Sequence, residues 1–600
     1  MKPSYIHSVV FLTPKGIKEN LMINPNISIT EIPNALSTDI DMASPKGIVQ
    51  ILRQTDTQIF NGWGTFEGLC DPEILSRIRR AVDETAAKFA DKGRVKVIIS
   101  GAGTSGRLAM FISRTFNRLA AQIGIEPCFH YLIAGGDLAL IRAQEGAEDD
   151  PITAQKELAA IANNADRVLY IGVTCGFSAP YIAGQLDYAS DQPNYFSILL
   201  GFNPAELSRK VKVENWDKTF ADVVEKIKDH PRCVLVNPVV GPEAITGSTR
   251  MKGGSATKLL LEVIFTAAFV KAKLLSPNYL AHTLKSEAWD MDRLIFAMIS
   301  QYETTRINTY AQRDGIARLL ELGGLALNSE RHIYYIGRDS YGVLGTVDAS
   351  ECPPTFGAAF EDVRGYVTDG WGELLNNQKD YSFAGDEYHI GLDDFIKEKL
   401  PNLSPEDFVI ILGKEETINS VQGVLEKIKA MEAKLGAVLI NPVYNVFPGF
   451  DAAVQLHIDP AGLVLSNETL GEYATKLVIN AITTGAHIMA GKIYQNRMID
   501  LNISNNKLFY RTINIIKDIV KADEETAFMS MMKSIYRTDT PTEEQCKAPV
   551  SAHINNATWK KKIVPKALLM STGKYNYEQA CKALEETPIV RAIIEKISKG

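Results

Sequence analysis

The chain carries one strand–loop–helix pattern twice. Residues 99–108 (ISGAGTSGRL) align with residues 335–344 (YIGRDSYGVL), and residues 256–262 (ATKLLLE) align with residues 474–480 (ATKLVIN). Similarity between segments this far apart indicates that one structural unit has been duplicated within the chain. The sequence therefore predicts an internal pseudo-dimer, and each half must be able to form the same fold.

Strand and helix patterns alternate within each copy. We predict strands at 95–100, 128–134, 168–173, 195–200 and 233–238 in the first copy, and at 333–336, 363–367, 408–412 and 437–441 in the second. Apolar strands that alternate with helices are typical of a parallel sheet covered by helices on both faces. The predicted fold class is therefore α/β, with two tandem doubly wound parallel sheets.

At 600 residues the chain exceeds what one hydrophobic core usually supports. Residues 1–60 are rich in Pro, Asn and Ser and weakly periodic, which predicts an arm that wraps a larger body. We place the first α/β domain at 61–285, the second at 286–495 and an all-helical cap at 496–600.

Charge and cysteine content exclude several classes of function. The 64 Lys and Arg are interspersed with 71 Asp and Glu, which argues against a nucleic-acid partner. Seven scattered cysteines without CxxC spacing favour reduced thiols, a cytoplasmic location and no structural zinc. The N-terminus lacks an apolar leader and the most apolar helix, Leu259 to Phe269, is short and contains Glu262, so we expect no export and no membrane span.

Two hydroxyl-rich turns predict a phosphate site. In the first copy a strand runs into Gly103, Thr104 and Ser105 and then into a helix, so backbone N–H groups, two hydroxyls and a positive helix end converge. The turn formally fits the GxGxxG dinucleotide pattern, but the strand that follows lacks the expected acidic residue. A sugar phosphate is therefore the predicted ligand, and no metal or organic cofactor is implied.

The second predicted turn, 174–178 (TCGFS), contributes Thr174, Gly176 and Ser178. An ordinary helix N-cap before Pro180 is the alternative for both hydroxyls. The second copy has no equivalent hydroxyl turn at 413–417 (GKEET), but it keeps 348–357 (DASECPPTFG), which the first copy has lost. This complementary loss predicts one ligand site assembled from both halves.

Several longer motifs resemble a known family. Residues 101–107 (GAGTSGR), 145–149 (EGAED), 240–243 (VGPE), 246–252 (TGSTRMK) and 348–355 (DASECPPT) are similar to the bacterial N-acetylmuramic acid 6-phosphate etherases. Those enzymes are single sugar-isomerase-type (SIS) domains that pair as dimers. The fused two-copy layout, with 484–493 (TGAHIMAGKI) and 506–511 (NKLFYR) before a helical tail, resembles the glucokinase regulatory protein family along nearly the whole chain.

The resemblance implies two functions. As an etherase, the chain would be a lyase that removes D-lactate from N-acetylmuramic acid 6-phosphate, and this is the leading expectation. Glu148 and Glu351 occupy the family's two catalytic glutamate positions, and two carboxyl groups suffice if their environments separate their pKa values. The alternative is a fructose-phosphate-responsive protein that inhibits a glucokinase- or hexokinase-type partner. A sugar-phosphate isomerase is a third, weaker option.

Each remaining site residue also has a purely structural explanation. Glu145 and Glu148 could merely favour a helix dipole, although the resemblance places Glu145 at the substrate. Glu351 is expected in a small apolar turn before Pro353, where a solvated carboxylate would be the structural alternative. The resemblance lets Lys476 reach the sugar, although such lysines are commonly solvated helix ends. We expect His487 to be a hydrogen-bonded core histidine.

The last three side chains are expected to be structural. Arg107 is expected to pack or pair near the first turn without touching the ligand. Cys175 and Cys352 flank site residues, but the family has no thiol mechanism, so we expect both to be small fillers.

Overall fold

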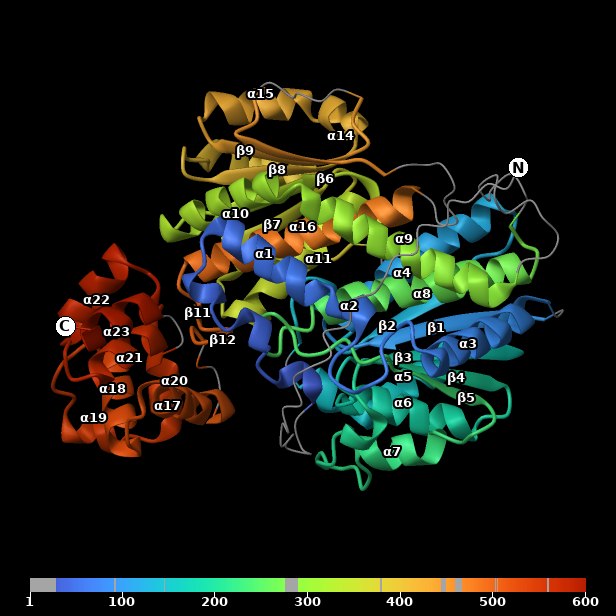
Figure 1. Cartoon of the computed structure of the whole chain (residues 1–600), viewed down its shortest axis with the longest axis horizontal. Helices are drawn as coiled ribbons and strands as arrows, with labels where there is room; N and C mark the ends of the chain where they lie inside the picture. Colours follow the sequence, from blue (N-terminus) through green and yellow to red (C-terminus); the bar gives the residue numbers. More distant parts are fainter. Residues whose placement is uncertain are drawn as a thin grey trace, which may run out of the picture.

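The computed structural model describes residues 28–90, 93–144, 146–275, 290–377, 380–443, 449–458, 467–501, 503, 506–557 and 560–599. Glu145 lies outside the described residues. Figure 1 shows two α/β halves side by side and a separate group of helices at the C-terminal end. The predicted fold class of two parallel sheets followed by a helical region is confirmed.

The first half contains a five-stranded parallel sheet in the order β2-β1-β3-β4-β5. Its strands are β1 (Val95–Gly101), β2 (Phe129–Ile133), β3 (Arg167–Val173), β4 (Tyr195–Leu200) and β5 (Cys233–Val236). Its helices are α3 (Pro72–Ala90), α4 (Thr104–Gln122), α5 (Pro151–Ile161), α6 (Pro180–Asp191), α7 (Phe220–Ile227) and α8 (Lys252–Lys271). The strands are almost completely buried, as expected where helices cover both faces.

The second half repeats this topology, because its sheet order is β10-β9-β8-β6-β7 and reads as β7-β6-β8-β9-β10 from the other edge. The strands are β6 (Ile333–Gly337), β7 (Val363–Val367), β8 (Phe408–Gly413), β9 (Lys434–Ile440) and β10 (Ala452–Leu456). Its longer helices are α9 (Met291–Ala311), α10 (Arg313–Asn328), α11 (Asp339–Phe356), α15 (Gln422–Ala430) and α16 (Asn467–Met489). The shared order supports the duplication that the sequence predicts.

The described part of the N-terminal arm, residues 28–60, is more ordered than its composition suggests. It contains α1 (Pro45–Asp56) and α2 (Gln58–Asn61), where a weakly periodic segment was expected. Ser44 caps α1 by accepting a hydrogen bond from Gly47 N, and Pro45 occupies the first turn. Helix α1 packs against α10 and α16, so the arm crosses onto the second half (Figure 1).

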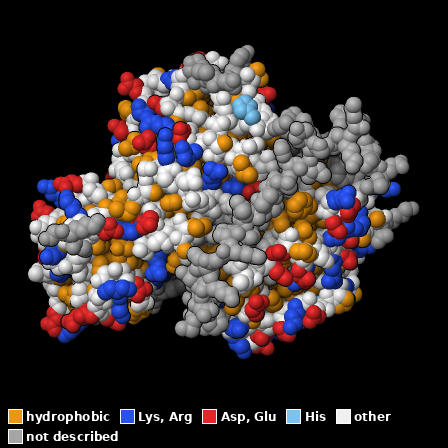
Figure 2. Space-filling model, in the orientation of Figure 1, with side chains coloured by type: hydrophobic (Ala, Val, Ile, Leu, Met, Phe, Trp, Pro, Cys, Tyr) orange, Lys and Arg blue, Asp and Glu red, His pale blue; other side chains and the backbone are white. Residues whose placement is uncertain are grey.

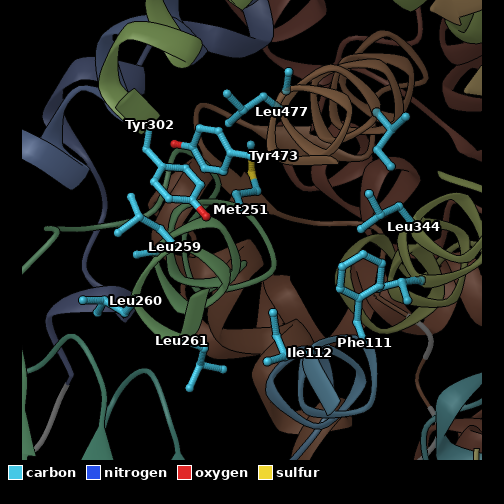
Figure 3. Close-up of a cluster of buried hydrophobic side chains, with 14 of the residues drawn as sticks. Phe111, Ile112, Met251, Leu259, Leu260, Leu261, Tyr302, Leu344, Tyr473 and Leu477 are labelled. Atoms are coloured by element: carbon cyan, nitrogen blue, oxygen red, sulfur yellow. The ribbon is translucent and has the colours of Figure 1, made fainter. Parts of the chain in front are cut away.

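Helix α8 of the first half packs against α9 and α16 of the second half. Figure 3 shows Leu259 of α8 on the side of Tyr473 of α16, and Leu260, Leu261 and Leu477 belong to the same buried cluster. Helix α8 is long and apolar enough to cross a membrane, but 89% of its most apolar window is buried inside the protein. It is therefore a core helix.

The C-terminal helices form what we call the cap domain, residues 506–599. It contains α17 (Asn506–Val520), α18 (Glu524–Tyr536), α19 (Glu543–Lys547), α20 (Val550–Ala557), α21 (Ile563–Ser571), α22 (Tyr577–Glu586) and α23 (Val590–Lys599). These helices share a hydrophobic core of their own. Acidic and basic side chains are interspersed over the described face of the protein in Figure 2, as the sequence predicts.

Candidate ligand site between the two halves

The first hydroxyl turn forms an open helix N-terminus at the carboxyl end of β1. Gly103 precedes α4 with φ +51°, and no described side chain caps the helix there. The turn is tight, because a Cβ on Gly101 would lie 2.4 Å from the carbonyl carbon of Ser105. Ser105 is only 7% exposed, whereas Thr104 is partly exposed and Gly103 exposed. An uncapped helix end beside hydroxyls is suited to an anion.

The second hydroxyl turn follows β3 and lies beside the first. Helix α6 begins at Pro180 after Ala179, with no side-chain cap among the described residues, so the helix-cap explanation for Thr174 and Ser178 is wrong. Thr174 is buried, and the Ser105 hydroxyl lowers the pKa of the neighbouring Cys175 thiol, which burial raises to about 12. The two turns are therefore in contact.

Glu351 lies inside helix α11, so the expected turn before Pro353 is wrong. Its side chain is buried, at 2% exposure. The helix continues through Pro353 and Pro354 to Phe356, and Gly357 caps it with φ +58° and an N–H that donates to the Pro353 carbonyl at 3.0 Å. Neither proline has an N–H, so each removes one intrahelical hydrogen bond from this last turn.

Both halves contribute to the surroundings of Glu351. Burial raises the pKa of this carboxyl, and Lys476, Arg107 and Arg250 act in the opposite direction, as does the Thr104 hydroxyl. A Cβ on Gly254 would lie 3.2 Å from both Thr104 Cγ2 and Lys476 Nζ, so the first-half turn and the second-half lysine flank one glycine. Lys476 is 3% exposed and lies within α16, not at a solvated helix end.

Arg250 also lies at this site, although no role was predicted for it. Its guanidinium bonds Asp348 Oδ1 at 3.0 Å and the hydroxyls of Thr483 and Thr484 at 2.9 Å, and its carbonyl accepts from Lys476 Nζ at 2.7 Å. Arg250 is therefore a first-half residue clamped by the second half. Its position in the 246–252 motif, among small residues, is the signal that could have identified it.

Several polar atoms of this region lack partners. Among the described residues, four buried side-chain atoms here have no hydrogen-bond partner: Arg107 Nη2, Ser248 Oγ, Arg250 Nε and Glu351 Oε1. Arg107 Nε donates to the Leu140 carbonyl at 2.9 Å, so this arginine packs near the turn as expected but also presents a free nitrogen. Buried polar groups are normally paired, so donors and acceptors left open together favour a polar ligand.

The other predicted acids are less central. Glu148 is exposed in the short 3-10 helix Ala147–Asp149, which packs against α6. The structure thus brings Thr104, Arg107, Arg250 and Lys476 to Glu351, and it leaves Glu148 on a separate, exposed element. Cys352 is fully buried in α11, and Cys175 is nearly so, in line with their expected role as fillers.

Two further features lie in the second half. A cavity of about 690 Å³ at the carboxyl end of β7 is bordered by Asp369, Trp371 and Asp393, and its described lining contains none of the predicted site residues. Nearby, His389, Asp394 and Glu398 place ligand-type atoms within 4.8 Å of one another. His389 and Glu398 already pair at 2.6 Å, and Asp394 accepts from Gly391 N, so each of the three groups already has a partner within the protein.

Comparison with known proteins agrees with this architecture. Residues 77–190 match the glucokinase regulatory protein N-terminal SIS domain, residues 310–490 its second SIS domain and residues 495–594 its C-terminal lid domain. The glucokinase regulatory proteins of Mus musculus and Homo sapiens are each 31% identical over 96% of this chain and 93% of their own length. An N-acetylmuramic acid 6-phosphate etherase of Edwardsiella ictaluri is 31% identical over 48% of this chain and 84% of its own length.

The etherase similarity thus covers about half of the chain, whereas the other similarity includes both sheets and the cap domain. The suspected family and the tandem SIS fold are both confirmed. This chain belongs to the glucokinase regulatory protein family.

Proposed function

We propose that this chain binds a phosphorylated hexose between its two SIS domains and, in response, regulates a glucokinase-type kinase in the cytoplasm. The observation that carries the proposal is the full-length similarity to glucokinase regulatory proteins, which extends through the lid at 495–594. The two etherase relatives, in contrast, match less than half of the chain.

The geometry supports a sugar phosphate as the ligand. The open end of α4 and the hydroxyls of Thr104, Ser105, Thr174 and Ser178 suit the phosphate, with Gly103 exposed beside them and Gly176 buried within the second turn. Lys476, Arg250 and Glu351 offer charged partners for sugar oxygens on the opposite side. The proposed ligand lies between these two sets.

A second candidate, the etherase-type lyase, is favoured by Glu351. Elimination of D-lactate needs a base for the C2 proton and an acid for the departing ether oxygen. Burial raises the pKa of Glu351, which suits a proton donor, and exposed Glu148 differs in environment as a base partner should. The sequence motifs are the further support for Glu148 and Glu351 as a catalytic pair. The third acid, Glu145, lies outside the described residues.

Ser105→Ala should weaken fructose 6-phosphate binding by roughly 1–3 kcal/mol, because a hydrogen bond to a charged phosphate is lost. Isothermal titration calorimetry measures the change. Ser113→Ala is the matched control on the same helix, since Ser113 donates to the His130 carbonyl, and should retain wild-type affinity. Equal affinity of Ser105→Ala and wild type would contradict the proposed phosphate contact.

Glu351→Gln separates the two candidate functions. If the chain is a lyase, D-lactate release from N-acetylmuramic acid 6-phosphate should fall by about 10²–10⁴-fold in this variant, as for loss of a general acid. If the wild type releases no lactate but binds fructose 6-phosphate and inhibits a glucokinase, the regulatory function stands and the lyase is excluded.

A further inference from the structure

The N-terminal arm begins, in the described chain, directly over the second hydroxyl turn. A Cβ on Gly176 would lie 2.7 Å from Ser28 Oγ and 3.4 Å from Thr30 Oγ1, and these two hydroxyls lie 2.9 Å apart. Ile29 N donates to Asn203 Oδ1 at 3.0 Å, and Gly247 N donates to the Thr30 carbonyl at 3.3 Å. Residues 28–30 therefore pack against two of the loops that hold candidate ligand groups.

The middle of the arm holds the loop that carries Arg250. Asn34 Nδ2 donates to the Pro242 carbonyl at 2.6 Å, and Ser37 Oγ donates to the Ala244 carbonyl at 2.7 Å. Asn496, which precedes the cap domain, donates to the Asn34 carbonyl at 2.8 Å and accepts from Thr246 N at 2.9 Å. The loop at 242–246, the arm and the segment before the cap domain are thus joined by one continuous set of hydrogen bonds.

The far end of the arm is anchored in the cap domain by one arginine. Arg591 of α23 bonds Asp39 at 2.9 Å, Asp41 at 3.1 Å and the Thr38 carbonyl at 3.2 Å. Asp41 is buried and also accepts from Gln495 N at 2.7 Å. A buried carboxylate paired with arginine is costly to separate, so this anchor has a defined docked state.

We propose that the arm, residues 28–41, is a wall of the sugar-phosphate site and transmits its occupancy to α23 of the cap domain through Arg591. This inference rests on the proposed sugar-phosphate function. A ligand in the Gly176 and Ser248 loops orders Ser28 and Thr30, and the ordered arm presents Asp39 and Asp41 to Arg591. Coupling of this kind is reciprocal, so a docked α23 strengthens ligand binding to the same extent.

The test compares Arg591→Ala with Lys547→Ala, a control that removes a cap-domain ion pair with Glu543 and leaves the arm untouched. Arg591→Ala should weaken fructose 6-phosphate binding by about 5-fold or more, the lower end of typical coupling, and Lys547→Ala should not. Hydrogen exchange should show that the ligand protects α23 amides in the wild type and not in Arg591→Ala. Wild-type affinity in Arg591→Ala, with unchanged α23 protection, would overturn the proposal.

Two further measurements keep the outcome clear. If Arg591→Ala does not fold, Asp41→Asn tests the same anchor from the arm side through its buried carboxylate, with the same expected loss of affinity. If the wild type binds no sugar phosphate, the proposed function fails, and the arm is then judged on the unliganded protein. In that case faster hydrogen exchange of the Gly247 amide in Arg591→Ala than in the wild type supports the link between the cap domain and the arm. An unchanged exchange rate rejects it.

Discussion

Replacing Lys258 with Met should lower the free energy of unfolding by about 3–5 kcal/mol, the usual cost of breaking a buried ion pair from one side. The Lys258 ammonium lies between Glu262 and Glu472, 2.9 Å from Glu472 Oε2, and all three side chains are at most 2% exposed. Tyr302 also donates to Glu262, whose pKa burial raises to about 7. Without the lysine, two carboxyl groups from two halves would share a dry site.

Urea unfolding measures this loss, and Lys271→Met on the same helix is the matched control. Lys271 pairs with Asp83, but both are more than a third exposed, so this variant should cost less than about 1 kcal/mol. Adding Glu262→Gln and Glu472→Gln to Lys258→Met should recover part of the stability, because the uncompensated charges are removed. A loss below 1 kcal/mol in Lys258→Met would show that the cluster does not hold the halves together.

The same cluster explains why the duplication leaves one candidate site. In the sequence repeat Lys258 corresponds to Lys476, Glu262 to Asn480, and Glu472 to Gly254. Gly254 leaves room beside Lys476 and Thr104, whereas Glu472 brings a carboxylate to Lys258. At the position equivalent to the candidate site, the Glu472 carboxylate thus takes the place that a ligand would have beside the lysine. Lys476 is therefore left to face a ligand, whereas the equivalent Lys258 forms a buried ion pair that joins the two domains.

Local patterns were sufficient to predict most of the sheet architecture. The strands at Tyr195–Leu200 and Val363–Val367 have the bounds that their apolar runs predict. Strand β10, at Ala452–Leu456, was not predicted, because an edge strand with partly exposed residues lacks a continuous apolar run. Helix α1 was also missed, since its packing against α10 and α16 depends on tertiary contacts that composition does not reveal.

The candidate site was likewise only partly predictable from the sequence. The turns around Ser105 and Thr174 follow directly from strand–turn–helix patterns, so their positions were predictable. The burial of Glu351 and the clamp on Arg250 depend on how the halves dock, which is a property of pairs of distant elements. Only the family motifs indicated Glu351 beforehand, and the residue pattern alone favoured a solvated carboxylate.

His487 should lower the free energy of unfolding by up to about 3 kcal/mol when the pH falls from 6.5 to 4, because it must stay neutral in the folded state. The ring is fully buried, stacks on Phe356 at 4.4 Å, and lies 2.7 Å from the Thr483 carbonyl. Burial is the largest cause and lowers the pKa of His487 from 6.5 to about 3. His487, which was expected to be a core histidine, therefore also contacts the turn of α16 that contains Thr483, whose hydroxyl accepts from Arg250.

The sign follows from proton binding. Between pH 6.5 and about 3 the unfolded chain binds a proton at this histidine and the folded chain does not, so acid favours unfolding at roughly 1.4 kcal/mol per pH unit. Urea unfolding across this range should therefore give a shallower pH dependence for His487→Gln than for the wild type. His457→Gln changes an exposed histidine and should retain the wild-type slope. Parallel pH curves for wild type and His487→Gln would mean that the buried ring accepts its proton without unfolding, contrary to its apolar and arginine-lined surroundings.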